Sequence, residues 1–204
     1  MTQAMAATPT SPIDSLLTRS SLAGAFMQAP APDDEQLRQI LGAAQRAADH
    51  DRLRPWRFQI VRPEQYEVFY DRLAEAATRV QGDPSRYERN REKYRLTARA
   101  PILVVAAAKI DTAAKVAPIE QAFAAAGATQ LVLNAAHALG FSAFLFSGPG
   151  VFDVPFKASL GLAETDHLIG FICLGSANGP GKPGPTAEAA VRDGLEQTVK
   201  QWAP

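Results

Sequence analysis

Hydrophobic positions along the chain change repeatedly between the spacing of helices and the spacing of strands. Apolar residues at i, i+3 and i+4 spacing, several with capping residues in front, predict helices over 11–19, 33–48, 66–80, 86–99, 119–139 and 187–202. Short apolar runs bounded by turn residues predict strands over 56–60, 101–108, 142–146 and 167–174. This order predicts one α+β domain in which helices cover a mainly antiparallel sheet, and not a parallel doubly wound fold.

Some of these segments are apolar on every side. Residues 101–108 have no polar face, which predicts a central strand covered by helices on both faces of the sheet. Residues 119–139 form a helix that is apolar nearly all round, which predicts burial in a large core or between subunits. Gly140 follows this helix at the position where a C-cap glycine belongs.

The folded domain is expected to span residues 13–175. Residues 1–12 contain no Lys or Arg and no apolar block, so we expect a disordered tail there and not a signal peptide. Residues 176–204 begin with a Gly/Pro-rich linker at 177–185 and continue into the helix expected at 187–202. We expect this stretch to be part of the same domain or an arm that reaches a dimer partner.

Composition narrows the possible functions. The 204 residues are 47% hydrophobic and carry a formal net charge of zero, which argues against a general binder of nucleic acid or of an anionic membrane. No apolar run reaches the length of a membrane span. The single cysteine, Cys173, excludes an internal disulfide and lies in an apolar strand, so we expect an inert core thiol and a cytoplasmic protein.

The sequence does not support a dinucleotide-binding loop or a metal site. Residues 179–184 match the glycine spacing of a dinucleotide fingerprint, but their prolines remove amide donors that a pyrophosphate needs. His50, His137 and His167 lie far apart and have no ligand spacing with Cys173, so no metal site is expected. The basic residues of 86–99 alternate with glutamates, which favours a solvated helix face or a flap over an anionic ligand.

The segment 46–58 is the most informative part of the chain. It places Arg46 and His50 near a helix end and then enters a strand at Pro55-Trp56. Backbone groups at helix ends and in loops before strands are free to hold ligands. Because Arg46 and His50 are separated by one helical turn, they can share one helical face. His50 could instead be a turn histidine paired with Asp49 or Asp51.

Together with Arg19-Ser20-Ser21 upstream and Phe146-Ser147-Gly148 downstream, this segment resembles the FMN-dependent nitroreductase family. The resemblance is to the compact branch, which carries an Asp-His turn followed by Pro-Trp, and it covers about 13–175. It implies a nitroreductase-like fold and a homodimer with FMN at the subunit interface.

The resemblance also implies roles for particular residues. Arg19, Ser20 and Ser21 match the segment that binds the ribityl phosphate, and a guanidinium with hydroxyl donors suits a phosphate. Arg46 and His50 match flavin-contacting positions. The stretch that approaches the flavin ring from the partner subunit is matched by Leu145, Phe146 and Ser147.

A further match is to the segment that the family associates with the nicotinamide nucleotide. Its residues here are Ala135, Ala136, His137, Ala138, Leu139 and Gly140. A buried helix end explains this segment equally well.

The chain departs from its relatives at two cationic positions. Ser20 stands where they carry a second arginine, and Leu145-Phe146 stands where they carry Trp-Arg. A cation near the flavin tunes its potential, so Arg52, Arg54 or Lys182 would have to compensate, or FMN binding would be weaker.

The resemblance implies an FMN-dependent oxidoreductase. In this interpretation NADH or NADPH gives hydride to the flavin N5, and an electron-poor small-molecule acceptor such as a nitroaromatic or a quinone then takes the electrons in a ping-pong cycle. No catalytic side chain is expected, because water can supply the protons. The alternative is a flavin-binding or flavin-sequestering protein of the same fold with little or no redox turnover.

Overall fold

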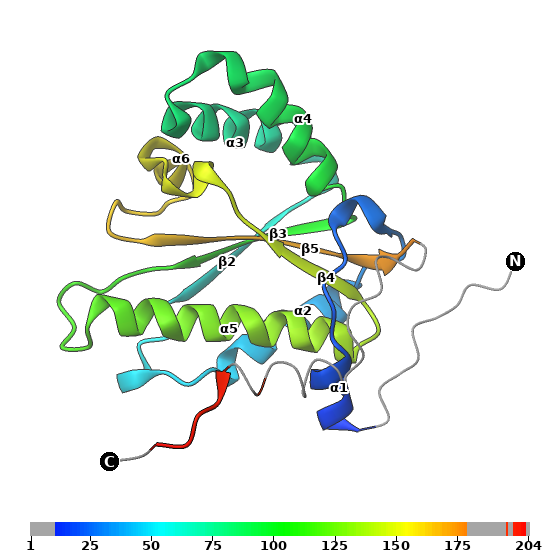
Figure 1. Cartoon of the computed structure of the whole chain (residues 1–204), viewed down its shortest axis with the longest axis vertical. Helices are drawn as coiled ribbons and strands as arrows, with labels where there is room; N and C mark the ends of the chain where they lie inside the picture. Colours follow the sequence, from blue (N-terminus) through cyan, green and yellow to red (C-terminus); the bar gives the residue numbers. More distant parts are fainter. Residues whose placement is uncertain (1–10, 179–194, 196–197, 203–204) are drawn as a thin grey trace, which may run out of the picture.

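The chain folds around one antiparallel sheet with helices on both faces (Figure 1). The computed structural model describes residues 11–178, 195 and 198–202. The tail expected at 1–12 lies almost entirely outside the described residues. The linker expected at 177–185 and the helix expected at 187–202 lie mostly outside them as well.

The sheet has five strands in the order β1-β5-β3-β2, and β4 pairs with β5. The strands are β1 Met27–Gln28, β2 Trp56–Val61, β3 Ile102–Ala108, β4 Ser142–Phe146 and β5 His167–Ala177. Every pairing is antiparallel, so the prediction of a mainly antiparallel sheet is confirmed. Among the described strands, β2 pairs only with β3 and β4 only with β5, so both form edges of the sheet.

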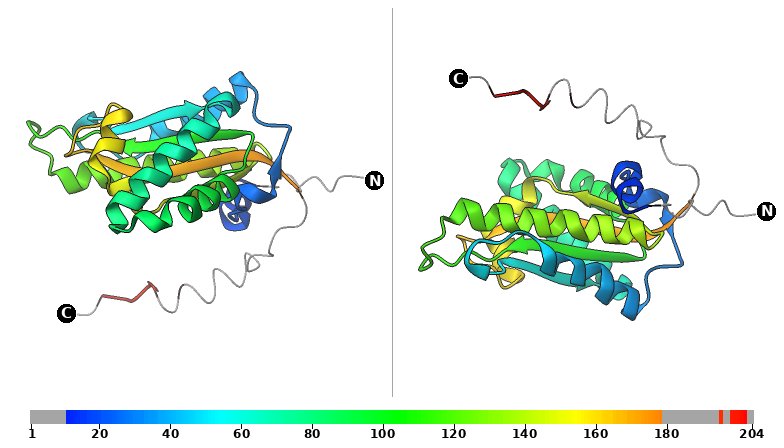
Figure 2. Two further views of the ribbon diagram at one scale, coloured as in Figure 1. Left: turned by 90° about the horizontal axis from the view of Figure 1, so that it is seen from above. Right: turned by 90° about the horizontal axis from the view of Figure 1, so that it is seen from below.

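Helices cover each face of this sheet (Figures 1 and 2). One face carries α3 Tyr66–Gln81, α4 Tyr87–Thr97 and α6 Val154–Ser159. The other carries α2 Asp34–Gly42 and the long α5 Pro118–Ala138, and α1 Pro12–Thr18 lies beside the C-terminal end of α5. The 3-10 helices are η1 Gly24–Phe26, η2 Ala43–Arg46, η3 His50–Arg52, η4 Pro63–Gln65, η5 Pro84–Arg86 and η6 Pro149–Phe152.

The central strand β3 explains why its sequence has no polar face. Leu103 and Val105 pack into the core cluster under α3, whereas Ile102 and Val104 pack into the cluster under α5. Successive side chains of a strand point to opposite faces, so a strand between two helical layers is buried at every position. The predicted central strand is therefore confirmed.

Local signals in the sequence set several helix boundaries. Asp33 caps α2 through a capping box with Gln36, and the Ser11 side chain caps α1. Gly140 ends α5 in a left-handed conformation, at φ 83°, and its N–H donates to the His137 carbonyl. Burial raises the pKa of Cys173 to about 12, so its prediction as a core thiol is confirmed.

The helix predicted over 33–48 is wrong in its second half. The α2 helix ends at Gly42, η2 ends at Arg46, and the backbone is extended at Ala47 and Asp49. The Asp49 carboxylate accepts a hydrogen bond from the Arg54 N–H at 2.7 Å, and aspartates that bond the nearby backbone compete with helix formation. Arg46 and His50 therefore do not share a helical face.

None of the helices in the described ranges is both long and apolar enough to cross a membrane.

Candidate functional site

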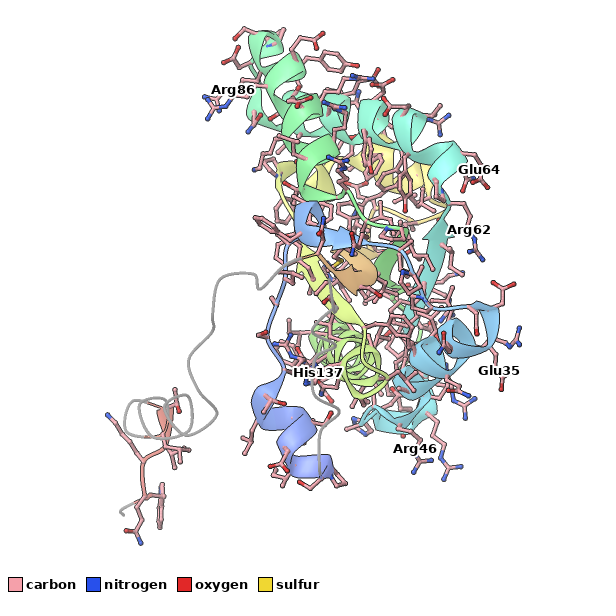
Figure 3. The ribbon with its side chains drawn as sticks, turned by 90° about the vertical axis from the view of Figure 1, so that its right-hand side faces the viewer. Glu35, Arg46, Arg62, Glu64, Arg86 and His137 are labelled. Carbon is pink, nitrogen blue, oxygen red and sulfur yellow. The ribbon has the colours of Figure 1, made fainter. Side chains whose placement is uncertain are left out.

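The residues at the end of α1 lie against the last turn of α5. Arg19 follows α1 with a non-helical backbone, and its Nη1 donates to the Ser21 hydroxyl at 3.4 Å. The Thr18 hydroxyl lies 3.2 Å from Nε2 of His137, which joins α1 to α5. Figure 3 shows His137 between these two helices. We call Thr18, Arg19, Ser21 and His137 the Arg19 cluster.

The Arg19 cluster has cationic and hydroxyl groups, and the described part of the chain gives it no ion pair with a carboxylate. Partial burial, and then the nearby Arg19 charge, lower the pKa of His137 below its ordinary value. A guanidinium beside exposed serine hydroxyls suits a phosphate ester.

A second group of residues lies at the opposite end of α5. The Nδ1 of His50 is 3.0 Å from Oε2 of Glu120, which belongs to the first turn of α5, and its Nε2 is 3.9 Å from Asp51. The hydrogen bond to Glu120, followed by the charge of Asp51, raises the pKa of His50. We call His50, Asp51 and Glu120 the His50 cluster. Arg46 lines a hollow beside this cluster, together with the residues that flank His50 and Asp51 in the sequence, Asp49 and Arg52.

The main partner of His50 is therefore a residue that local sequence reasoning missed. Asp51 contributes at longer range, while Asp49 instead accepts from the backbone of Arg54. Glu120 is distant in sequence, and its position in the first turn of α5 was the only signal available.

The loop that carries His50 holds an unusual backbone. Asp51, Arg52 and Arg54 have φ values of 59°, 56° and 48°. Residues other than glycine seldom adopt these values, and such conformations concentrate at ligand-binding sites. The strained loop thus supports the choice of 46–58 as a functional segment.

Open hollows lie beside this loop. One of about 320 Å³ is lined by Arg46, Asp49, Arg52, Arg54 and Trp56, among others. It adjoins a groove of about 670 Å³ between α2 and β2, which is lined by both arginines and apolar side chains. The residues of the groove include Leu37, Arg38, Arg54, Trp56, Arg57, Phe58, Ile60 and Arg62.

The two clusters are too far apart to meet on one small molecule. Glu120 and His137 lie on the same helix, and a rise of 1.5 Å per residue places them about 25 Å apart along its axis. Figure 1 shows α1 beside the C-terminal end of α5, whereas His50 bonds to its N-terminal end. A mononucleotide bound by one cluster cannot also touch the other cluster of the same chain.

The stretch Leu145–Ser147 lies at the end of the edge strand β4. Its middle side chain faces the core: Phe146 is 7% exposed, and its ring centroid is 5.2 Å from that of Phe171. Alternation along β4 turns the Phe146 side chain toward α3 and into the core, and its role as a flavin contact stays a prediction. Leu145 is half-buried on the α5 side, and Ser147 is exposed.

Gly148 has a structural explanation inside the chain. A Cβ at this position would lie 2.7 Å from the hydroxyl oxygen of Tyr94. The close backbone approach that this glycine allows is therefore to Tyr94.

The other predicted residues divide between the two clusters or remain apart from both. Ser20 is exposed next to Arg19. In the nicotinamide segment, Ala136 is buried in the core, Ala135 and His137 are half-buried, and Ala138, Leu139 and Gly140 are exposed at the helix end. Arg52 and Arg54 line the hollow beside the His50 loop, so within one chain they do not lie beside Arg19. Lys182 lies outside the described residues.

Two of the four basic residues of α4 form ion pairs with acidic side chains. Arg91 pairs with Asp71 and Glu67, and Arg95 pairs with Glu92. This pattern agrees with a solvated helix face.

In the ranges that the structure describes, no group of three or more His, Cys, Asp or Glu residues is arranged to hold a metal ion.

Comparison with known proteins identifies relatives over most of the chain. The model of the nitroreductase family matches residues 17–176. A protein of Escherichia coli (strain K12) named "Putative NAD(P)H nitroreductase YdjA" is 33% identical over 147 residues, which is 72% of this chain and 79% of that protein.

Solved structures share the fold at lower identity. The crystal structure of a nitroreductase-like family protein from Bacillus cereus has a TM-score of 0.75 at 18% identity and covers 98% of this chain and 100% of its own. A nitroreductase with bound FMN from Bacteroides fragilis NCTC 9343 has a TM-score of 0.69 at 19% identity, with 95% and 100% coverage.

Proposed function

This chain belongs to the nitroreductase family, and on that premise we propose that it is an FMN-dependent oxidoreductase that acts as a homodimer. The observation that carries this proposal is the placement of the family's matched residues in two clusters at opposite ends of α5. Because one chain cannot bring both clusters to one cofactor, each site would combine the Arg19 cluster of one subunit with the His50 cluster of the other.

The residues of the Arg19 cluster fit the phosphate end of FMN. Arg19 offers a permanent charge, and Ser20 and Ser21 offer hydroxyl donors that are exposed. No carboxylate among the described residues competes for Arg19. We infer that the phosphate binds here and fixes one end of the cofactor.

Exposed apolar side chains on α1 and on the first turns of α5 support pairing of two copies. In α1 the small polar Ser15 is buried, whereas Ile13 and Leu16 are 58% and 53% exposed. On α5, Ile119 and Phe123 are 56% and 66% exposed. Apolar side chains in this arrangement favour a protein interface. Two α5 helices packed antiparallel about a two-fold axis would bring each Arg19 cluster toward the partner's His50 cluster.

His50 and Arg46 would act at the other end of the cofactor. A neutral His50 that donates Nδ1–H to Glu120 presents Nε2 as an acceptor, and the raised pKa of its ring favours the form that donates from both nitrogens. Arg46 is exposed at the end of η2 and offers a second donor. These groups would bind and orient the flavin, and none is required as an acid or a base.

Bound FMN would supply the redox chemistry by accepting hydride at N5 from NADH or NADPH and passing electrons to an electron-poor acceptor such as a nitroaromatic or a quinone. The protein would contribute binding, orientation and a dimer interface. The flavin-sequestering alternative keeps the same site and differs only in turnover.

The test is a visible spectrum of the purified protein, followed by addition of NADH or NADPH without oxygen. We expect a bound flavin spectrum that bleaches with the reductant and recovers with a nitroaromatic or a quinone. Flavin that binds but is not bleached by either nucleotide would support the sequestering alternative. Protein that takes up no added FMN would refute the proposal in both forms.

A further inference from the structure

The hydrogen bonds around His137 fix which of its ring nitrogens carries the proton. The Thr18 hydroxyl donates to the Asp14 carbonyl oxygen at 2.6 Å. A hydroxyl has one hydrogen, so Thr18 cannot also donate to the histidine 3.2 Å away. It must accept from Nε2–H of His137. The neutral ring therefore keeps its lone pair on Nδ1, which has no hydrogen-bond partner among the described residues.

The charged side chain that acts on the His137 ring within the described ranges is a cation, Arg19, and it disfavours a second positive charge. On α1, the backbone carbonyl of Asp14 accepts the hydrogen bond from Thr18. The strand β4, which packs against α5, has no charged residue. The C-terminal end of α5 favours a cation at His137. An incoming anion would therefore decide whether the ring is protonated.

We propose that His137 is a second, titratable cation of the phosphate site, which takes up a proton at Nδ1 when the phosphate of FMN binds beside Arg19. This inference rests on the proposed function. It assigns His137 to the phosphate end of the cofactor and not to the nicotinamide nucleotide. The proton comes from solvent, and no covalent bond to the protein forms or breaks.

The consequence is a pH dependence of FMN affinity with a defined sign. His137 would be a stronger base in the complex than in the free protein, so affinity is highest below its free-state pKa and falls as pH rises through its pKa in the complex. The phosphate of FMN has its second pKa near 6 and is mostly dianionic above pH ~6.5. Titrations at pH ~6.5 and ~8.5 therefore report mainly on the protein.

The experiment is a titration of the full-length protein with FMN and with riboflavin at both pH values, by flavin fluorescence. We expect wild-type protein to bind FMN about tenfold more weakly at the higher pH, the typical effect of losing one charge-assisted hydrogen bond. Riboflavin, which has no phosphate, should lack this loss. Calorimetry in buffers of different ionisation enthalpy should detect proton uptake with FMN only.

Variants separate His137 from the other histidines. His137→Gln keeps a donor for Thr18 and should bind FMN with the weaker, high-pH affinity at both pH values, whereas His137→Lys should bind tightly at both. His167→Gln changes an exposed histidine at the start of β5 and should retain the wild-type profile. His50 contributes equally to the pH dependence of FMN affinity in wild type and in His137→Gln. The difference between these two pH profiles therefore reports on His137 alone.

A direct measurement guards against a variant that fails to fold. The ring resonances of His137 in wild-type protein, followed by NMR against pH, should give a higher pKa with FMN than without it. Equal FMN affinity of wild type and His137→Gln at both pH values, or an unmoved His137 pKa, would overturn the inference and leave the proposed function intact. Absence of FMN binding to wild type would instead refute the proposed function, and the inference with it.

Discussion

Replacing Phe146 tests whether the end of β4 presents its side chain to the cofactor or to the core. The Phe146 ring is 7% exposed, and its centroid lies 5.2 Å from Phe171, 6.1 Å from Phe144 and 6.5 Å from Tyr94. Truncating a core phenylalanine to alanine costs about 3–5 kcal/mol. Phe146→Arg adds an unpaired guanidinium among aromatic rings, which costs several kcal/mol more unless the chain rearranges.

These values are large compared with the total stability of a domain, which is about 5–15 kcal/mol. For a chain of this length, 1 kcal/mol shifts Tm by about 2–4 °C, so we expect Phe146→Ala to lower Tm by about 6–20 °C. Phe146→Arg should lower it further or prevent folding. The assay is thermal unfolding followed by circular dichroism, together with an FMN titration of each folded variant.

The matched control is Ser147→Arg, which adds the same cation at the next, exposed position. It should leave Tm within about 2 °C of wild type, as surface substitutions usually do. A stable Phe146→Arg protein that binds FMN more tightly would show that the side chain faces the cofactor, and would refute the placement of this ring in the core.

Other predictions concern particular contacts. Arg19→Ala should weaken FMN by about tenfold or more and leave riboflavin unaffected, because it removes a charge-assisted phosphate contact; equal losses for both ligands would refute this role. Gly148→Ala should destabilise the protein by about 1–3 kcal/mol in urea unfolding, since its Cβ would lie 2.7 Å from the Tyr94 hydroxyl oxygen, and the Tyr94→Phe background should recover part of that loss. Hydrogen bonds from Arg79 hold the pKa of Asp153 below its ordinary value, so the stability that Asp153 contributes is complete above the usual carboxyl range and is lost as pH falls through the lowered pKa. Asp153→Asn should therefore be less stable than wild type at pH 7, with a smaller difference near pH 3; a difference that does not change with pH would contradict the linkage.

Much of the fold follows from local patterns in the sequence. The Asp33 capping box, the continuous apolar run of β3 and the glycine after α5 each identify an element by a rule that operates within a few residues. The break after Arg46 did not follow in this way, because the apolar spacing continues to Ala48 while the Asp49 side chain bonds the backbone of Arg54.

Contacts between distant elements limited the prediction of the site. The pairing of His50 with Glu120 joins a loop to the first turn of a helix that comes two strands later in the chain. The direction of Phe146 depends on the register of β4 against β5, where it stands opposite Phe171. A shift of that register by one residue would exchange the faces, and the sequence of β4, with Phe144 and Leu145 both apolar, does not distinguish them.

The length of α5 connects the fold to the function we propose. A shorter helix would let the Arg19 and His50 clusters meet within one chain, and the site would then need no partner. Because α5 holds them about 25 Å apart, neither cluster alone offers contacts to both ends of a flavin mononucleotide. The exposed apolar residues of α1 and α5 lie on the elements that carry or adjoin these clusters. Assembly of the dimer and assembly of the cofactor site would therefore be one event, in which bound FMN stabilises the interface through mass action.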